Sequence, residues 1–186
     1  MTLGVSAILV LAGFFSAGPT ASLPSAGPGS QTQPASQDAP ARGRIGLPDA
    51  DRTPGAINPD VTVDNLDATI CKPGWARTVR PSAAYTGPLK VYQIFQYRYA
   101  DRDPLHYQED HLVPLELGGA PKDPKNLWPQ PNEVSLPDGT ALGADEKDDL
   151  EDELHARVCA GTMALADAQR MMATDWIAAW EAAGRP

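Results

Sequence analysis

A long stretch poor in large apolar side chains limits where this chain can fold. Between Gly18 and Gly55 the sequence is rich in Pro, Ser, Ala, Gly and Gln, with Leu23, Ile45 and Leu47 as its few large aliphatic residues. Such a segment cannot bury enough apolar surface to offset the conformational entropy that folding removes. We therefore expect a disordered linker over residues 18–55, serving as a tether or an inert spacer, and one folded domain over residues 56–186.

The N-terminal run of residues 3–17 is apolar and ends in small residues. Its fifteen residues suit the core of a signal peptide, whereas a membrane-spanning helix needs roughly 20. Only two uncharged side chains precede the run, so the positive n-region of a secretory signal is missing and an uncleaved membrane anchor is the alternative. We expect residues 1–17 to direct export, which makes the protein secreted or cell-surface associated.

The charge of the chain is acidic but uneven. The formal net charge is −9 and the isoelectric point is near 4.7, which excludes a protein that coats nucleic acid through charge alone. Residues 61–100 nevertheless contain only two acidic residues against five basic ones, which are Lys72, Arg77, Arg80, Lys90 and Arg98. A locally basic surface is therefore compatible with the sequence.

The two cysteines, Cys71 and Cys159, lie near opposite ends of the expected domain. In an exported protein an even number of cysteines predicts a disulfide, and closing a loop of this length contributes on the order of 4 kcal/mol in the chain-entropy view. A zinc site is a weaker interpretation because CxxC spacing is absent from the sequence. Two buried free thiols are the alternative for a cytosolic protein.

Helical patterns lie on both sides of the centre of the domain. Thr86-Gly87-Pro88 predicts the start of a helix that ends near Ala100. Its apolar side chains are Leu89, Tyr92, Ile94, Phe95 and Tyr97. We expect them in the core, with a platform for stacking bases as the alternative.

Two further helices are expected at the C-terminus. Residues 144–159 place Leu150, Leu154 and Val158 on one stripe, with acidic residues in the first turn, where they complement the helix dipole. The neighbouring face carries Asp148, Glu151, Asp152 and His155. Thr162 is the expected N-cap of a final helix that runs to about Ala183 and stops at Gly184. Its expected buried stripe is Leu165, Ala168, Met172, Trp176 and Trp180.

Between these helical regions we expect short strands and irregular loops. Residues 107–112 predict a strand that Pro114 ends, and Gly118-Gly119 predicts an irregular loop behind it. Residues 126–128 predict a brief returning strand, which the prolines at 129 and 131 should break. A second loop, rich in Pro, Gly and Asp, then runs to about residue 143.

The adjacent pair Asp110-His111 is the strongest candidate for chemistry. Histidine has an ordinary pKa of about 6.5 and can accept a proton from water near neutral pH. Neighbouring side chains on a regular strand point to opposite faces, so the two can converge only where the strand ends. By the same alternation His106 should be peripheral. Glu109 and Glu116 are expected to face solvent.

The run Asp110-His111-Leu-Val-Pro-Leu-Glu-Leu-Gly-Gly119, followed by Asn126-Leu127, resembles the HNH branch of the His-Me finger (ββα-metal) nucleases. The signature of that branch is D-H-hydrophobic-x-P, a Gly-Gly loop and N-L. The resemblance covers about residues 107–159 and implies an α+β fold in which a ββα-metal motif packs with additional helices. The flanking ICxPGW, NLWP and tryptophan-rich C-terminal helix look like a family of small exported bacterial proteins.

The resemblance also implies roles for individual residues. His111 would be the general base that activates water, Asp110 a metal ligand, and Asn126 the residue that holds His111 in orientation across the loop. The metal would be one divalent cation, Mg²⁺ first and Mn²⁺ or Zn²⁺ as alternatives. The sequence departs from the usual pattern because it has no zinc knuckles and about a dozen extra residues delay the helix. The further ligand therefore stays open among His155, Glu151 and Asp148.

These inferences predict a metal-dependent HNH-like endonuclease that hydrolyses phosphodiester bonds of nucleic acid with weak sequence selectivity. DNA is the favoured substrate over RNA. The first alternative is a catalytically degenerate HNH scaffold that acts as an extracellular binding or structural module. The second is a metal-dependent hydrolase of a different phosphoester.

Overall fold

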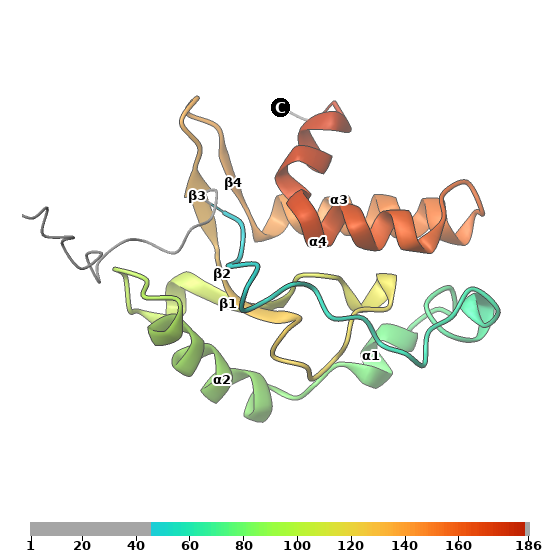
Figure 1. Ribbon diagram of the computed structural model, residues 1–186, viewed down its shortest axis with the longest axis horizontal. Helices are drawn as coiled ribbons and strands as arrows, with labels where there is room; N and C mark the ends of the chain where they lie inside the picture. The colour runs from blue at the N-terminus through green and yellow to red at the C-terminus, as the bar shows by residue number, and fades with distance from the viewer. Residues whose placement is uncertain (1–45, 185–186) are drawn as a thin grey trace, which may run out of the picture. The chain divides into compact units, whose positions relative to one another are not determined.

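The computed structural model describes residues 46–184 (Figure 1). The expected export segment and residues 18–45 of the expected linker lie outside this part of the chain. The described residues form a mixed α+β fold of four α-helices and two small antiparallel sheets. The helices are α1 (Trp75–Val79), α2 (Ala83–Gln96), α3 (Ala144–Cys159) and α4 (Leu165–Ala182). The strands are β1 (Tyr107–His111), β2 (Leu127–Pro131), β3 (Glu133–Ser135) and β4 (Ala141–Gly143).

The first sheet pairs β1 with β2, in a register that sets His111 opposite Leu127 and Tyr107 opposite Pro131. The expected returning strand is therefore present, but the prediction that Pro129 and Pro131 break it is wrong. The two prolines occupy alternate positions, where their missing N–H groups share one edge of the strand. Gln130, the residue between them, remains able to donate to β1.

Helix α2 packs against β1 and β2, while α3 and α4 pack together on the other side of this sheet (Figure 1). Helix α2 begins at Ala83 and ends at Gln96, so the predicted start at Thr86 and the predicted end near Ala100 are wrong. The first turn forms because the amides of Tyr85 and Thr86 both donate to the carbonyl of Ser82. Pro88 is the sixth residue of the helix, where its missing N–H removes one hydrogen bond of the helical ladder.

The prediction that the apolar side chains of α2 lie in the core is only half correct. Ile94 and Tyr97 are 1% and 3% exposed, whereas Tyr92 and Phe95 are 59% and 58% exposed. The helix thus buries one side against the sheet and presents aromatic rings to solvent on the other.

The segment between β2 and α3 forms a hairpin instead of the expected loop. In it β3 pairs with β4, and β4 leads directly into α3. Helix α3 has the predicted bounds, and Leu150, Leu154 and Val158 are buried as predicted.

The final helix, α4, buries the predicted stripe of apolar side chains. Thr162 does not cap it, because Ala164 is the N-cap and the Thr162 hydroxyl donates to the carbonyl of Arg157 at the end of α3. Asp175 is not helical (φ −163°, ψ 87°), and its carboxylate accepts the amide of Ala178 at 2.8 Å. Asp175 therefore acts as a cap inside α4, at a kink that divides the helix into two parts.

The folded part begins before the expected boundary at residue 56. The hydroxyl of Thr53, which is 1% exposed, bonds the hydroxyl of Tyr97 at 2.6 Å and the carbonyl of Leu127 at 3.2 Å. The carbonyl of Gly46 accepts the indole N–H of Trp176 at 3.1 Å. Residues 46–55 are therefore part of the packed structure, held by these hydrogen bonds to Tyr97, Leu127 and Trp176. None of the helices within residues 46–184 combines the length and apolar character that a membrane crossing requires.

Candidate functional site

Asp110 and His111 lie at the C-terminal end of β1, where the strand gives way to the loop of residues 112–126. The Asp110 side chain is 15% exposed and faces α3, where its Oδ2 accepts a hydrogen bond from Lys147 Nζ at 2.7 Å. His111 is 4% exposed, and its Nε2 lies 3.0 Å from the carbonyl oxygen of Pro121. The loop thus turns back over the end of the strand and contacts the imidazole.

The contact with Pro121 determines the tautomer of His111. A carbonyl can only accept, so Nε2 carries the proton and donates, which leaves Nδ1 as the basic nitrogen of a neutral ring. Burial holds the pKa of His111 below its usual value, with the bond to Pro121 acting in the opposite direction. At neutral pH His111 is therefore an uncharged ring with one nitrogen able to accept a proton.

Asn126 fastens the loop from inside. Its side chain is fully buried, and Oδ1 accepts the amide of Val113 at 2.8 Å, while Nδ2 donates to the carbonyls of Val113 at 2.9 Å and Ala120 at 3.1 Å. Asn126 immediately precedes β2, so these three bonds tie the two ends of the loop together. The backbone that carries Pro121 is held in place as a result, and His111 with it.

The double glycine is needed for this close approach. A Cβ on Gly119 would lie 1.8 Å from the carbonyl oxygen of Val113 and 2.6 Å from Asn126 Nδ2, so no larger residue fits. Gly118 has φ +75°, a conformation that glycine adopts without strain. The two glycines therefore allow the loop to fold onto the end of β1.

Lys147, in the first turns of α3, is fully buried against this site. Its ammonium donates to Asp110 Oδ2, to the carbonyl of His111 at 3.0 Å and to Glu151 Oε1. Burial alone would lower its pKa, but the charges of Asp110 and Glu151 outweigh burial and raise it. Sequence reasoning missed this residue, although its spacing from Leu150 and Leu154 places it on the buried stripe of the helix.

Three carboxylates meet beside Lys147. Oxygen atoms of Asp110, Asp148 and Glu151 all lie within 4.8 Å of one another. Burial and the charge of Asp110 raise the pKa of Asp148. Burial raises the pKa of Glu151 to about 8, against the opposing charge of Lys147. Each shift shows that negative charge is costly here without a further cation.

The donor set fits a divalent cation that prefers oxygen ligands, such as Mg²⁺. When all three carboxylates are ionised, as binding of a cation requires, the single ammonium leaves an excess of two negative charges. Each carboxylate has two oxygens, and Lys147 takes one from Asp110 and one from Glu151. Oxygens remain on all three side chains, which makes Asp148 and Glu151 the candidates to complete the site with Asp110.

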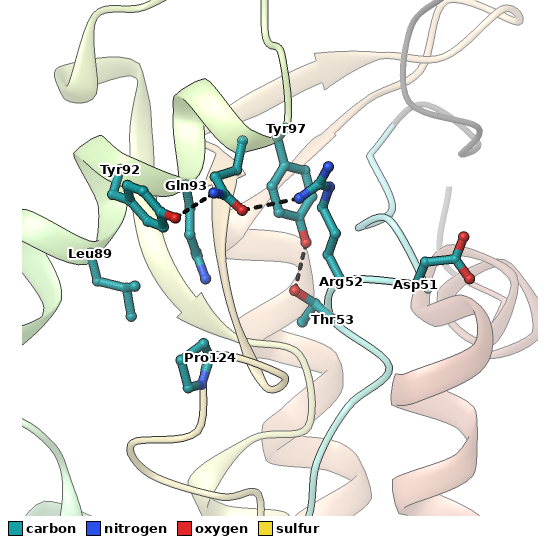
Figure 2. A pocket seen from close by; sticks show the side chains of 9 residues that line it. Asp51, Arg52, Thr53, Leu89, Tyr92, Gln93, Tyr97 and Pro124 are labelled. Carbon is teal, nitrogen blue, oxygen red and sulfur yellow. Dashed lines mark hydrogen bonds between the residues drawn. The ribbon is translucent and has the colours of Figure 1, made fainter. Parts of the chain in front are cut away.

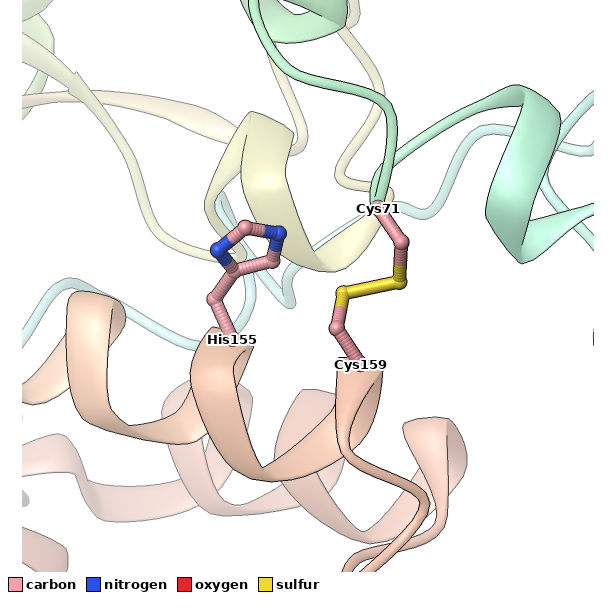
Figure 3. A group of neighbouring side chains, drawn as sticks. All are labelled: Cys71, His155 and Cys159. Atoms are coloured by element: carbon pink, nitrogen blue, oxygen red, sulfur yellow. A yellow bond between two sulfur atoms is a disulfide. The ribbon is translucent and has the colours of Figure 1, made fainter.

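The structure places His155 elsewhere. Its Nε2 donates to the carbonyl of Ile70 at 2.9 Å, and its Nδ1 lies 4.0 Å from a carboxylate oxygen of Glu116. Figure 3 shows His155 beside the disulfide between Cys71 and Cys159, whose formation confirms the predicted pairing. His155 is thus not brought together with Asp110, and the bonded sulfurs are not free to hold zinc.

Arg80 is a second functional candidate that sequence reasoning did not single out. It is exposed at the end of α1, and its positive charge contributes to lowering the pKa values of both His111 and Asp148. The signal available in the sequence was the cluster of five basic residues between 61 and 100.

Two nearby acid–base groups behave differently from one another. Both carboxylate oxygens of Glu109 are buried and have no hydrogen-bond partner among the described residues, and burial raises its pKa to about 8. The prediction that Glu109 faces solvent is therefore wrong, because its carboxylate is buried within range of the Lys90 charge on α2. His106 is exposed, as expected for a peripheral residue, and pairs with Asp101 at 2.5 Å.

The site thus belongs to a unit of two antiparallel strands and a helix within an α+β domain, in which the strand end carries an acid–histidine pair and the helix carries carboxylates. Neither a family model nor a curated protein or solved structure matches the chain. The function must therefore be inferred from the site itself.

Proposed function

We propose that the protein is a metal-dependent endonuclease of the HNH type that hydrolyses phosphodiester bonds of nucleic acid, with DNA as the favoured substrate. One observation carries the proposal. A neutral histidine at the end of β1 lies next to Asp110, and Asp148 and Glu151 on α3 bring their oxygens within 4.8 Å of that carboxylate. The order of strand, Asn-fastened loop, strand and helix, with the β3–β4 hairpin inserted before the helix, supports the ββα-metal resemblance of the sequence.

His111 would take the proton from the attacking water. Its Nε2–H is committed to Pro121, so the ring accepts through Nδ1 and cannot rotate without losing that bond. General bases of this kind contribute roughly 10²- to 10⁴-fold to the rate. A divalent cation held by Asp110, Asp148 and Glu151 would stabilise the charge that develops on the leaving oxygen.

Arg80 would bind the phosphate. It is exposed, it is near enough to His111 and Asp148 to influence both, and a guanidinium matches two phosphate oxygens at once. The basic cluster to which it belongs offsets the acidity of the whole chain at the place where the substrate must approach. The disulfide supports an oxidising location, in line with secretion or display at the cell surface.

The test is cleavage of supercoiled plasmid, linear DNA and RNA by the oxidised full chain with Mg²⁺, Mn²⁺, Zn²⁺ or EDTA. We expect metal-dependent cleavage that His111→Ala reduces by roughly 10²- to 10⁴-fold. His106→Ala is the matched control, because it removes an exposed histidine, and it should cleave like the wild type. Absence of metal-dependent cleavage, or full activity of His111→Ala, would contradict the proposal.

A second candidate is a catalytically degenerate scaffold, and Lys147 is the observation that favours it. Its buried ammonium already satisfies Asp110 and Glu151, as it would in a protein that binds no metal. Calorimetric titration with Mg²⁺ and Mn²⁺ separates the candidates. Binding that Asp148→Asn weakens and that Asp152→Asn leaves unchanged supports the enzyme, whereas no binding by the wild type supports the scaffold.

A further inference from the structure

A separate pocket lies between α2 and the first described residues of the chain. Its volume is about 320 Å³, within the lower range of ligand pockets. Tyr92, Gln93 and Tyr97 line it from α2 and the residue after it, Thr53 from the N-terminal side, and Pro124 from the loop before β2 (Figure 2). None of these residues takes part in the proposed chemistry.

Gln93 leaves a hydrogen-bond acceptor unused in this pocket. The residue is 6% exposed, and its Nε2 donates to the carbonyl of Leu127 at 2.9 Å. Because that partner can only accept, the nitrogen must face Leu127 and the Oε1 position is fixed. Oε1 has no partner among the described residues and exposes less than 1 Å² of its surface, so a donor from the pocket reaches it only when the surrounding side chains shift. Figure 2 shows the side chain extending between Tyr92 and Tyr97 towards Pro124. A buried acceptor of this kind is costly unless a donor meets it.

Tyr92 provides an exposed ring next to this acceptor. It is 59% exposed, and its hydroxyl accepts a hydrogen bond from Gln96 Nε2 at 2.5 Å. Gln96 Oε1 in turn accepts from Arg52 at 3.1 Å. These two bonds orient the ring at the rim of the pocket and leave its faces for contact with a flat ligand.

The chemistry of the pocket matches a nucleobase better than a phosphate. The rim carries Arg52 together with Asp51, so it has no excess positive charge for an anion. A base has a flat face for stacking, and every common base has an N–H donor on its pairing edge for Gln93 Oε1. Residues 69–100, which include α2, contain five basic residues and no acidic one, which suits the attached phosphate backbone.

The pocket is adjacent to the proposed active site. Gln93 and Thr53 both bond the carbonyl of Leu127, and Leu127 is the residue that pairs with His111 across the sheet. Paired residues on antiparallel strands are roughly 5 Å apart at Cα. The loop of residues 112–126 also contributes to both places, through Pro121 at the histidine and Pro124 at the pocket.

We propose that this pocket takes one unpaired base of the nucleic-acid substrate, stacked on Tyr92 and hydrogen-bonded to Gln93. The protein therefore prefers single-stranded or locally opened strands over closed duplex. This inference rests on the proposed function for the identity of the ligand, and its readout is binding without cleavage.

The test measures the affinity of the oxidised full chain for a fluorescent oligothymidylate by anisotropy in EDTA. Loss of stacking on one base corresponds to roughly a 5- to 150-fold rise in Kd, which we expect for Tyr92→Ala. Tyr92→Trp should retain affinity because it retains an aromatic face. Phe95→Ala is the matched control, since Phe95 is an equally exposed aromatic on the same helix, does not line the pocket and stacks under Arg102 at 4.7 Å.

An abasic oligonucleotide of equal length separates base recognition from charge. We expect it to bind the wild type weakly, and Tyr92→Ala should not weaken it further. The same affinity of Tyr92→Ala and wild type for oligothymidylate overturns the proposal. So does a wild type that binds no oligothymidylate, or one that binds closed duplex more tightly than single strands.

Cleavage assays on the same proteins keep the two proposals apart. A wild type that binds oligothymidylate through Tyr92 but cleaves nothing with any metal overturns the endonuclease and leaves the base pocket standing. Metal-dependent cleavage together with equal affinities of all variants overturns the base pocket and leaves the endonuclease standing.

Discussion

The side chain of Asn126 joins the two ends of the loop of residues 112–126 through three hydrogen bonds. The backbone hydrogen bonds that pair β1 with β2 cannot supply these contacts. A strand pair orders its own residues, but the carbonyl of Pro121 that His111 needs lies in irregular backbone. In the loop, the buried side-chain amide of Asn126 accepts one hydrogen bond and donates two, and so takes the place of the hydrogen bonds that pair the strands. The position of the imidazole therefore depends on a residue whose side-chain hydrogen bonds go to Val113 and Ala120 and not to the ring.

Replacing Asn126 by alanine should lower both stability and activity. The substitution leaves the amide and carbonyl of Val113 and the carbonyl of Ala120 without their partner. Each unsatisfied buried group costs roughly 1–3 kcal/mol, so the free energy of unfolding should fall by roughly 3 kcal/mol or more in urea titration. Asn132→Ala is the control, because its amide is exposed and donates only to Leu105. Equal stability of the two variants would show that the loop does not depend on Asn126.

The exposed pair His106–Asp101 should titrate in a predictable direction. The hydrogen bond from His106 to Asp101 raises the pKa of His106, and backbone bonding at Asp103 together with His106 lowers that of Asp101. Because the folded pKa of the histidine lies above its unfolded value of about 6.5, the pairing contributes fully below that pH and is lost as pH rises through the folded pKa.

Proton NMR of the His106 ring measures this directly. In Asp101→Asn the pKa of His106 should fall back towards 6.5, whereas Asp152→Asn on α3 should leave it unchanged. An identical His106 titration in wild type and Asp101→Asn would show that the pair does not form in solution.

Helix α3 carries both positively and negatively charged side chains to the end of β1. Lys147 and Glu151 are four residues apart on the buried side, and Asp148 follows Lys147 on the more exposed side. The helix thus carries a cation and two carboxylates to Asp110, and its apolar stripe of Leu150, Leu154 and Val158 fixes the rotation that aims them.

Removing the ammonium should therefore be costly. In Lys147→Met the carboxylates of Asp110 and Glu151, whose side chains are 15% and 16% exposed, lose their cation. Breaking a buried pair from one side costs roughly 3–5 kcal/mol of unfolding free energy. If the carboxylates hold a metal, added Mg²⁺ should restore part of that loss in the variant. Lys122→Met, at an exposed lysine, is the control, and a matching response of both variants would contradict the role of Lys147.

The sequence pattern predicted a helix correctly where the apolar residues of that helix lie on a single face. Residues 144–159 have an acidic start and a four-residue apolar repeat, and the helix has those bounds. Helix α2 was misjudged because its apolar residues belong to two faces. Ile94 and Tyr97 point to the sheet, and Tyr92 and Phe95 lie roughly half a turn away from them. Only the packing partner decides which face is covered.

The part of the candidate site that lies close together in the sequence could be predicted, and the part that α3 contributes could not. Asp110, His111 and Asn126 lie in one short segment, so their spacing constrains their geometry. The helix contribution depends on how far α3 slides along β1, which no local pattern specifies. His155 shares a face with Glu151 but lies four residues, about 6 Å, further along the helix. That displacement takes it to the disulfide, and Lys147, one turn before Glu151, reaches Asp110 instead.

Across the whole described domain, the disulfide connects the segment before α1 to the last residue of α3, at a sequence separation of 88. A bond that closes so long a loop restricts the unfolded chain by about 4–5 kcal/mol in the chain-entropy view. It also joins the basic segment that contains Arg80 to the helix that carries the carboxylates.

The double variant Cys71→Ser/Cys159→Ser should lose roughly 2–5 kcal/mol of unfolding free energy in denaturant titration. A reductant should lower the stability of the wild type by a similar amount and have no effect on the double variant. Equal stability of oxidised and reduced wild type would show that the bond does not stabilise the fold.

Lys147 gives the carboxylate group a counter-ion that is part of the polypeptide. Small domains built around a bound metal unfold when a chelator removes it, because ligand charges are then left facing one another. Here the helix can dock on β1 before any ion arrives, since the ammonium already bridges Asp110 and Glu151. Assembly of the fold and binding of the proposed metal are thus separable events, and a chelator should abolish the proposed activity while the protein stays folded.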